Sequence, residues 1–432
     1  PEEPMQSEQV TVYQNPSYRS FVLVFLTLIY AVNFVDRQLI AILQEAIKAD
    51  LGLSDTQLGL LSGFAFALFY VVAGVPIARW ADRSSRRNII AISVGLWSFM
   101  TAISGAAQNF FQLLLARIGV GVGEAGCSPP AHSMISDMYP ADQRATALSF
   151  YSVGINIGIM IGFLLGGYIN EFFGWRIAFV VVGAPGILIA IIFWLTVKEP
   201  IRGYSDKQPV SDETIPLMKV VGFIVERRFL IHVSLGAALS GLVGYALTNW
   251  SASFFIRSHN MPTSELGLWL ALGIGVFGGI GTFGWGYLCD KFGRADKRWY
   301  MWLPSLSILL CVPFVVVVLT VESTSTALWV NLFPAMFTTG YLGSCLAVFH
   351  GTVEPRMRAT ASALFFLILN IIGLGLGPTL VGVISDYLAP SLGGADALRY
   401  ALLIVVPIGS VWAATHFYLA ANGWAESQRQ KA

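Results

Sequence analysis

Charged residues are scarce in this chain. Aspartate, glutamate, lysine and arginine make up 12% of its 432 residues, about half of their usual share in soluble domains. Hydrophobic residues make up 55%, and the mean hydropathy is +0.67. The net charge of +1 leaves no basic surplus of the kind that nucleic-acid-binding proteins carry. The composition therefore predicts a polytopic membrane protein with the lipid bilayer as its surroundings and no nucleic-acid partner.

Cysteine is rare as well, and its four positions show no metal-type spacing. We therefore expect neither a disulfide framework nor a metal site. The first eighteen residues lack the short apolar core and cleavage site of a signal peptide, so the first apolar run should remain as a transmembrane helix. No nucleophile–base constellation and no nucleotide-binding loop is visible, so we expect neither an enzyme nor a bound cofactor. The cysteines are Cys127, Cys289, Cys311 and Cys345.

Twelve apolar runs are long enough to cross a bilayer as helices. None shows the period-two alternation of a transmembrane β-strand. The predicted fold class is therefore an all-α membrane protein with twelve transmembrane helices. The runs are Ser20–Leu43, Thr56–Ala78, Asn88–Ala107, Phe110–Met134, Ala145–Asn170, Ile177–Val197, Phe229–Ile256, Leu266–Cys289, Trp299–Val321, Ala327–Val353, Ala359–Ser385 and Tyr400–Trp424.

The longest connection, residues 198–228, is polar and divides the chain into two six-helix bundles, 19–197 and 229–424. Residues 1–18 and 425–432 form tails. Most lysines and arginines follow the even-numbered helices, whereas the opposite loops hold only Lys48, Arg176, Arg257 and Arg399. By the positive-inside rule, both tails and the linker should be cytoplasmic. We expect an integral protein of a bacterial inner membrane.

The two halves repeat. The segment Ala78-Arg-Trp-Ala-Asp82-Arg-Ser-Ser-Arg86-Arg87 follows helix 2, and Gly286-Tyr-Leu-Cys-Asp290-Lys-Phe-Gly-Arg294 follows helix 8. The tetrapeptide Arg-Ala-Thr-Ala opens helix 5 and again helix 11. Such spacing predicts parallel repeats. We expect Asp82 and Asp290 to pair with the nearby arginines and to close the cytoplasmic face; the alternative is solvated positive-inside charge. The expected gate is Asp82, Arg86, Arg87, Asp290 and Arg294.

Four formal charges lie inside predicted spans: Asp36 and Arg37 in helix 1, and Arg117 and Glu124 in helix 4. Charges at such depth are costly, so they face a bundle interior or an aqueous cavity. The helices enter from opposite sides, which places Asp36 and Arg117 at matching depth, ~10 Å below the outer surface. This pair is either a structural ion pair or part of a functional site.

Glu124 lies ~10 Å deeper than Arg117, with no expected partner at its own depth. Burial of an unpaired carboxyl group makes it protonatable, which a proton-coupled carrier needs. We therefore predict Glu124 and Asp36 as proton-coupling residues. The glycines of the same helix allow close helix packing, and Pro129 and Pro130 should interrupt the helix just past the glutamate. His132, His232 and His350 are candidate proton carriers too, but each lies alone near a cytoplasmic helix end, where an interfacial position is expected.

The duplicated loop pattern in a twelve-helix chain resembles the major facilitator superfamily over nearly the whole sequence. It departs at Ala78 and Ser85, where the first motif usually has glycines, and at the single basic residue Arg294. The strings Asn33-Phe-Val-Asp36-Arg37, Gly121-Val-Gly-Glu124-Ala and Met134-Ile-Ser-Asp137-Met-Tyr-Pro140 resemble the Spinster family. That resemblance implies transport of lysophospholipids or sphingoid-base phosphates, with proton coupling in some members.

Two glycine-rich stretches can be interpreted in two ways. Residues 158–167 of helix 5 resemble the antiporter signature of the superfamily, with Phe163 in place of its proline. Gly373-Leu-Gly-Leu-Gly377-Pro378 is the related stretch of helix 11. Tight helix packing by small residues explains both stretches equally well.

The predicted function is alternating-access secondary transport of an amphipathic anion by a monomer, with the proton as coupling ion and no other cofactor. The charged wall lies in the N-terminal half, and helices 7 to 12 offer aromatic and amide groups. The alternatives are a hydrophobic drug/H⁺ antiporter, a small organic-anion transporter, or, in another class, an energy-independent lipid scramblase or a non-transporting sensor. The predicted substrate-binding residues are Arg37, Arg117, Glu124, Asn249, Trp250, Phe254 and Asn370.

Overall fold

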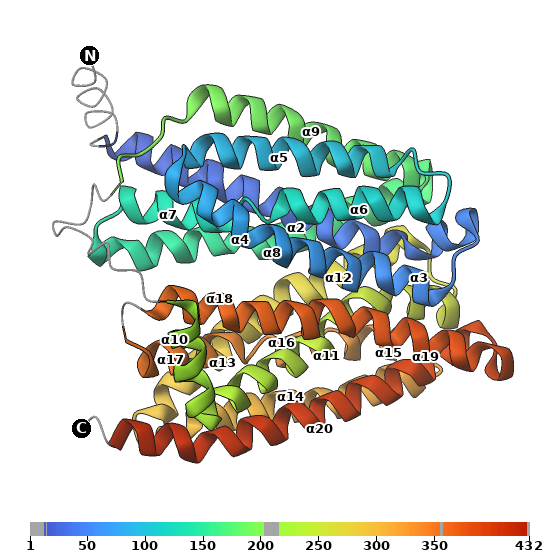
Figure 1. Cartoon of the computed structure of the whole chain (residues 1–432). Helices are drawn as coiled ribbons and strands as arrows, with labels where there is room; N and C mark the ends of the chain where they lie inside the picture. Colours follow the sequence, from blue (N-terminus) through green and yellow to red (C-terminus); the bar gives the residue numbers. More distant parts are fainter. Residues whose placement is uncertain (1–12, 14, 203–215, 355–356, 430–432) are drawn as a thin grey trace. The chain divides into compact units, whose positions relative to one another are not determined.

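A computed structural model of the chain describes residues 13, 15–202, 216–354 and 357–429 (Figure 1). Within these ranges every regular element is a helix, and twelve helical spans are long and apolar enough to cross a membrane. The predicted fold class is confirmed. Contacts divide the chain into two compact units, residues 1–46 with 68–212 and residues 47–67 with 213–432. Residues 47–67, which comprise the end of helix 1 and the start of helix 2, therefore group with the second unit, which the sequence did not predict.

The first unit contains the first six spans, apart from the start of the second. Its helix α5 packs against both α6 and α9, and their polar residues are few because lipid and neighbouring helices surround them. The helices are α2 (Pro16–Leu51), α4 (Ala65–Arg83), α5 (Arg86–Ser104), α6 (Phe110–Glu124), α7 (Ser128–Met138), α8 (Ala141–Phe173) and α9 (Trp175–Thr196).

Helix 4 is broken at the predicted place. Helix α6 ends at Glu124, and α7 begins at Ser128 with proline in its first positions. In the turn between them, the amides of Gly126 and Cys127 donate to carbonyls three residues back, at 3.2 and 3.1 Å. Proline has no N–H to continue the α-helical pattern, so the break falls directly after the glutamate. The break leaves Glu124 at a helix end inside the bundle.

The second unit contains the last six spans and the start of helix 2. Its helix α11 packs along α20 and α19. Among its described residues, three stretches are π-helical, and such stretches often occur at functional sites. The elements are α3 (Asp55–Gly59), η1 (Leu60–Phe64), α10 (Leu217–Glu226), α11 (Arg228–His259), α12 (Thr263–Leu270), η2 (Ala271–Phe277), α13 (Gly278–Gly293), α14 (Trp299–Thr320), α15 (Thr324–Asn331), α16 (Pro334–Thr338), α17 (Leu342–Thr352), α18 (Arg358–Ile368), η4 (Leu369–Leu376), α19 (Gly377–Leu392) and α20 (Gly394–Arg429).

The glycine stretches of helices 5 and 11 pack in corresponding ways. A Cβ on Gly158 would lie 2.6 Å from Cβ of Phe34, so helix 5 packs directly on helix 1. A Cβ on Gly377 would lie 2.6 Å from the carbonyl oxygen of Leu242, so helix 11 packs on helix 7. Small residues permit these approaches. Both contacts favour the packing interpretation of the glycines, and their correspondence agrees with the predicted repeat.

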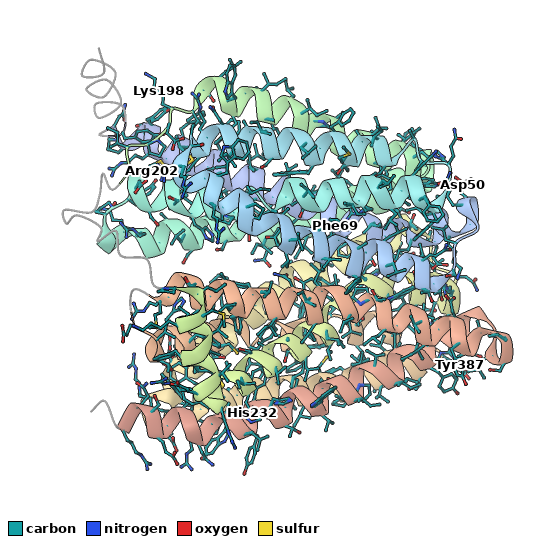
Figure 2. The ribbon with its side chains drawn as sticks, viewed as in Figure 1. Asp50, Phe69, Lys198, Arg202, His232 and Tyr387 are labelled. Atoms are coloured by element: carbon teal, nitrogen blue, oxygen red, sulfur yellow. The ribbon has the colours of Figure 1, made fainter. Side chains whose placement is uncertain are left out.

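Many large apolar side chains are exposed on the outer surfaces of both units. Phe111 of α6 and Phe283 of α13 are 71% and 70% exposed, and Tyr387 of α19 is 83% exposed (Figure 2). A soluble protein would bury such residues in its core. In a twelve-span membrane protein they face lipid, which is as apolar as they are.

Candidate substrate and proton site

The four intramembrane charges form two ion pairs within the first unit. Arg117 contacts Asp36, with Nη1 3.5 Å from Oδ1, as the matching depths predicted. Glu124 contacts Arg37, whose Nε donates to Oε2 at 2.6 Å. The expectation that Glu124 lacks a partner is therefore wrong. Arg37 follows Asp36 directly in α2, and its long side chain reaches Glu124 on α6.

The Asp36 pair is shielded almost completely. Its two side chains are each 2% exposed, and the hydroxyl of Thr101 on α5 donates to Oδ2 of Asp36. The pair therefore joins α2, α5 and α6 at one point. Two buried charges that compensate each other and receive an added hydrogen bond meet the condition for a tolerable buried ion pair.

The Glu124 pair is different because one partner is accessible. The side chain of Arg37 is 15% exposed, whereas that of Glu124 is 0% exposed. Oε1 of Glu124 accepts no hydrogen bond from the described residues, although the amide of Asn33 lies beside it. A buried carboxylate with one unbonded oxygen is costly as an anion, and protonation relieves that cost. The arrangement can bind a proton.

Aromatic rings surround the Arg37 guanidinium. Its carbon lies 5.1 Å from the ring centroids of both Phe34 and Tyr70, within the range of a cation–π interaction. The Phe34 ring also meets the Tyr30 ring edge-on at 5.3 Å. Helix α2 thus places Tyr30, Phe34 and Arg37 about one turn apart on one face. Tyr30, Phe34 and Tyr70 were not among the residues predicted from the sequence, although the spacing of Tyr30, Phe34 and Arg37 by four and three residues was a usable signal.

The row of rings continues beyond α2. Tyr30 stacks on Tyr151 of α8 with centroids 4.4 Å apart and planes at 6°. The ring of His132 on α7 meets Tyr151 edge-on at 5.3 Å. We call Tyr70, Phe34, Tyr30, Tyr151 and His132 the aromatic row. Arg37 lies beside Phe34 and Tyr70, so the row places a positive charge next to several apolar rings, of which Tyr151 is fully buried.

The predicted aromatic wall of helix 7 is packed inside the second unit. Asn249, Trp250 and Phe254 are 6%, 0% and 2% exposed. Nε1 of Trp250 donates to the carbonyl of Pro378 at 2.9 Å, and Nδ2 of Asn249 donates to the carbonyl of Tyr245, also at 2.9 Å. These contacts give the helix-7 residues packing roles, because core side chains are arranged in this way. Asn370 is half-buried in the π-helical segment η4.

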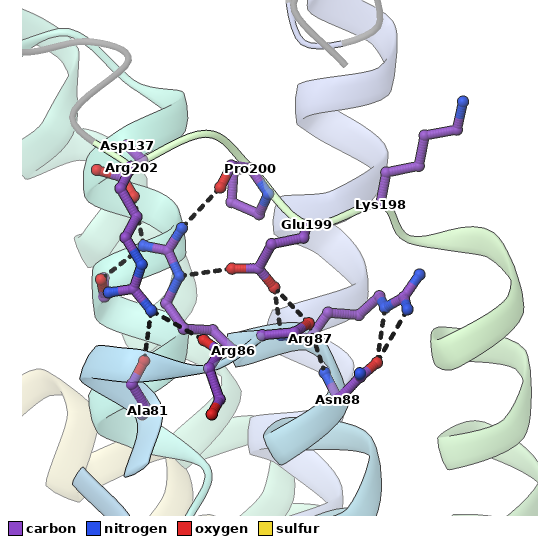
Figure 3. A network of polar contacts seen from close by, with 12 residues as sticks. Ala81, Arg86, Arg87, Asn88, Asp137, Lys198, Glu199, Pro200 and Arg202 are labelled. Atoms are coloured by element: carbon purple, nitrogen blue, oxygen red, sulfur yellow. Dashed lines mark hydrogen bonds and ion pairs between the residues drawn. The ribbon is translucent and has the colours of Figure 1, made fainter. Parts of the chain in front are cut away.

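Arg86 of the first loop motif is the centre of a buried network (Figure 3). Its Nε donates to Oε1 of Glu199 at 2.8 Å, and its Nη2 donates to the carbonyl of Pro200 at 2.8 Å. Nη1 donates to Asp137, at the end of α7. The side chain of Asp82, its predicted partner, lies outside the described part of the chain. Arg86 therefore joins the start of helix 3 to the ends of helices 4 and 6, all within the first unit.

The neighbouring Arg87 follows a simpler pattern. Its backbone amide donates to Oε2 of Glu199 at 2.8 Å, and its side chain donates to the amide oxygen of Asn88 (Figure 3). The Arg87 guanidinium also lies over the Trp194 ring. The sequence identified Arg86 and Arg87 but not Glu199. Glu199 was missed because it follows helix 6, far from the motif in sequence.

The second loop motif does not form the expected pair. Asp290 accepts a hydrogen bond from the hydroxyl of Tyr300 at 3.1 Å, and within the described ranges no ion pair joins it to Arg294. The charge in this loop is compensated locally. Arg298 contacts Asp296 at 2.7 Å, and its hydrogen bonds lower the pKa of Asp296 below the usual aspartate range.

A third cluster, which the sequence did not predict, holds residues 47–67 against the rest of the second unit. Asp55 at the start of α3 forms a two-pronged ion pair with Arg257 of α11, with both N–O distances 2.7 Å. The hydroxyl of Ser385 on α19 donates to Asp55 at 2.6 Å, and Lys48 contacts it as well. Asp386 accepts the backbone amides of Asp55 and Thr56. We call Asp55, Arg257 and Ser385 the Asp55 clamp.

Besides His132 in the aromatic row, the other two histidines also have contacts that the sequence did not predict. His232 of α11 is not alone, because its Nδ1 lies 2.8 Å from Nδ1 of His416 on α20. His350 lies 2.7 Å from the hydroxyl of Ser362. The pairing of His232 was missed because His416 lies at the other end of the second unit's sequence.

A family model described as Major Facilitator Superfamily matches residues 26–378. A protein of Mycolicibacterium smegmatis (strain ATCC 700084 / mc(2)155), described as an MFS-type efflux pump, is 35% identical over 399 residues, which cover 91% of each chain. Protein spinster homolog 1 of Xenopus tropicalis is 29% identical and covers 96% of this chain and 83% of its own.

A solved structure is similar over nearly its full length. It is the crystal structure of a bacterial homologue of the human lysosomal transporter Spinster, in an inward-facing and unoccupied conformation. The TM-score is 0.87 at 35% sequence identity, and the match covers 96% of this chain and 99% of that one. The resemblance suggested by the charged strings of helices 1 and 4 is therefore confirmed.

Proposed function

Because the chain belongs to the Major Facilitator Superfamily and is Spinster-like, we propose that it is a proton-coupled secondary transporter of an amphipathic anion such as a lysophospholipid or a sphingoid phosphate. Arg37 would bind the anionic head group, and the aromatic row would contact the apolar tail. Glu124 would bind the proton. Such transporters alternate between two states around a site near the middle of the bilayer, where Glu124 is expected.

The accessibility of Arg37 is the observation that carries this proposal. Of the four buried charges, Arg37 alone has a side chain exposed by more than 2%. Guanidinium groups bind phosphates and carboxylates through two parallel hydrogen bonds. A substrate with an anionic head and an apolar tail matches a cation beside a row of rings.

Proton coupling follows from the charge of the pair. With Glu124 ionised, Asp36, Arg37, Arg117 and Glu124 sum to zero, and Glu124 occupies Arg37. With Glu124 protonated, the cluster carries one positive charge and Arg37 can bind an anion. Substrate affinity and protonation of Glu124 would then be linked, and by thermodynamic reciprocity each would favour the other. Asp36 would keep Arg117 neutralised throughout, or would accept a second proton.

Purified protein in vesicles tests the proton role. We expect Glu124→Gln, which mimics the neutral acid, to bind anionic substrate and to lose the response of transport to an imposed pH gradient. Glu265→Gln, at an exposed position of α12, should keep that response. If Glu124→Gln responds to the gradient as the unaltered protein does, Glu124 is a structural partner of Arg37 only.

The head-group role of Arg37 is tested in the same background. Arg37→Gln alone would leave Glu124 buried and unpaired, so the informative comparison is between Glu124→Gln and the double variant Arg37→Gln/Glu124→Gln. Loss of one charge-assisted contact of ~1.5–3 kcal/mol should weaken binding of an anionic amphiphile about tenfold or more. Binding of an uncharged amphiphile with the same tail should not change. Equal weakening for both ligands would contradict the proposal.

Efflux of hydrophobic drugs is the second candidate, because the Mycolicibacterium smegmatis relative is described as an efflux pump. Aromatic rings beside a carboxylate also suit a cationic drug. Protonation of Glu124 should have opposite effects on the two kinds of ligand. Ionised Glu124 would favour binding of a cation, and protonated Glu124 would favour binding of an anion. Binding of each ligand class to Glu124→Gln therefore distinguishes them. A transporter of small organic anions should bind its substrate without contacts to the aromatic row. A lipid scramblase should keep its activity in Glu124→Gln without any pH gradient.

We also propose a bacterial inner membrane as the location, with both chain ends in the cytoplasm. The excess of lysine and arginine in the loops after even-numbered helices supports this orientation. Transport by the monomer is the simplest arrangement, because all four charges of the site come from one chain.

A further inference from the structure

The His232–His416 pair joins the start of α11 to the later part of α20 within the second unit; Figure 2 labels His232. Both rings are partly buried, with centroids 5.0 Å apart. The transport site described above uses neither residue, because its four charges lie in the first unit. Two polar rings at a helix contact of a membrane-spanning unit need a reason, because polar groups in this setting are costly unless they pair or bind something.

The short distance fixes how the two rings share hydrogen. Nδ1 atoms 2.8 Å apart form a hydrogen bond, in which one ring donates and the other accepts. A neutral histidine that accepts at Nδ1 must carry its own hydrogen on Nε2. The pair therefore always presents at least one N–H donor away from the shared bond. A phosphate oxygen is a suitable acceptor for that donor.

Positive charge lies next to the pair. Arg228, the first residue of α11, is exposed and precedes His232 by four residues, so the two share a helix face. Arg227 before it stacks over Phe223 of α10 at 3.6 Å. An arginine and a histidine pair at one end of a helix bundle provide the charge and the donors for one anionic head group.

An apolar groove lies on α20 next to the pair. It has a volume of about 500 Å³ and is lined by Pro407, Ile408, Val411, Trp412 and Thr415. The Trp412 ring lies 6.3 Å from the His416 ring, so the groove ends at the histidine pair. Pro407 lies inside α20 and has no backbone N–H to donate. The groove runs toward the middle of the helix, as an acyl chain below its head group would.

Helix α10 lies at the same end of the unit, across the direction of α11 and α20 (Figure 1). Val220 is buried against the unit's core, whereas Leu217, Met218 and Val225 are 53%, 75% and 57% exposed. The exposed apolar side chains of this short helix suit contact with the acyl-chain boundary of a bilayer. The head-group level of the bilayer should therefore coincide with Arg228 and His232.

We infer that the second unit binds an anionic phospholipid, with the phosphate at Arg228, His232 and His416 and one acyl chain in the groove along α20. The site lies on the outer face of the unit and is independent of the proposed substrate. Charge complementarity selects an anionic over a zwitterionic head group, and the groove selects a lipid over free phosphate.

Native mass spectrometry of the full-length protein in detergent tests the inference. The probes are phosphatidylglycerol and phosphatidylcholine with identical acyl chains, added in equal amounts. We expect the unaltered protein to retain phosphatidylglycerol preferentially. His232→Phe/His416→Phe, which keeps the ring size but removes every donor, should lose the preference, and Arg228→Gln should reduce it about fivefold.

His259→Phe is the matched control, since His259 lies at the other end of α11 and contacts Thr324; its preference should equal that of the unaltered protein. If the double histidine variant does not fold, Trp412→Ala provides the test. This change removes a ring from the exposed face of the groove, so it should weaken retention of both lipids. Retention of phosphatidylglycerol by the double variant at the level of the unaltered protein would overturn the inference. Equal retention of both lipids by the unaltered protein would do so too, because the lipid would then be annular only.

Discussion

At the scale of single residues, the four buried charges have two different roles. Asp36 and Arg117 are equally shielded and are supported by Thr101, whereas the Glu124 pair has an accessible cation. The first pair suits the structural interpretation that the sequence left open, and the second suits the functional one. Consecutive residues Asp36 and Arg37 can serve both pairs because successive side chains leave a helix at different angles.

We predict that Asp36 and Arg117 are energetically coupled. Asp36→Asn or Arg117→Gln alone leaves one buried charge uncompensated and should cost about 3–5 kcal/mol of stability. The double variant should cost less than the sum of the two. A double-mutant cycle on thermal unfolding in detergent measures the difference. Strictly additive losses would mean that the 3.5 Å contact contributes no stability.

At the scale of helices, the sequence predicted where the helices lie, but not where they become π-helical or how they are rotated against one another. Hydropathy and proline are local signals, so the twelve spans and the break after Glu124 could be predicted. The π-helical stretches η1, η2 and η4 could not, because nothing in their composition differs from ordinary helix. The pairing of Arg37 with Glu124 depends on the rotation of α2 against α6, which is set by packing along both helices. Close glycine contacts are part of that packing.

We predict that Gly158→Ala destabilises the protein. Its Cβ would overlap the carbonyl oxygen of Ala31 and the Cβ of Phe34, and such overpacking costs about 1–3 kcal/mol. Gly284→Ala is the control, since a Cβ at this exposed position of α13 meets nothing within 4 Å. It should be neutral or stabilising by up to ~1 kcal/mol, because alanine favours helix over glycine. Thermal unfolding of the two variants in the same detergent compares them, and equal unfolding temperatures would contradict the packing role of Gly158.

At the scale of the whole chain, the helix-2 start is the part that sequence reasoning placed least well. Residues 47–67 belong to the first predicted bundle by sequence, yet their contacts join them to the second unit. The sequence placed Lys48 and Arg257 in the non-cytoplasmic loops. Their shared partner Asp55, however, lies 202 positions from Arg257. A contact between residues so far apart requires the tertiary fold. The repeat, by contrast, was predictable because similar sequence motifs occur at corresponding positions of the two halves.

The last prediction concerns the Asp55 clamp during transport. If the sequence-defined bundles rock against each other, residues 47–67 must leave α11 and α19 in one of the two states. Asp55→Asn removes the carboxylate to which both Arg257 and Ser385 donate hydrogen bonds. It should therefore raise the fraction of molecules in which residues 47–67 are released. Leu58 is 1% exposed on the segment, so a cysteine at this position reports on release.

In a Leu58→Cys background, Asp55→Asn should increase the labelling rate by a membrane-impermeant maleimide at least severalfold. The four native cysteines are buried and give a low background. The control is Arg399→Gln, which breaks a more exposed ion pair with Asp396 in the same unit. Exposed pairs contribute at most ~1 kcal/mol, so this change should not alter the labelling rate of the cysteine at position 58. Unchanged labelling in Asp55→Asn would mean that glycine contacts such as Gly59 against Pro378, and not the clamp, hold the segment in place.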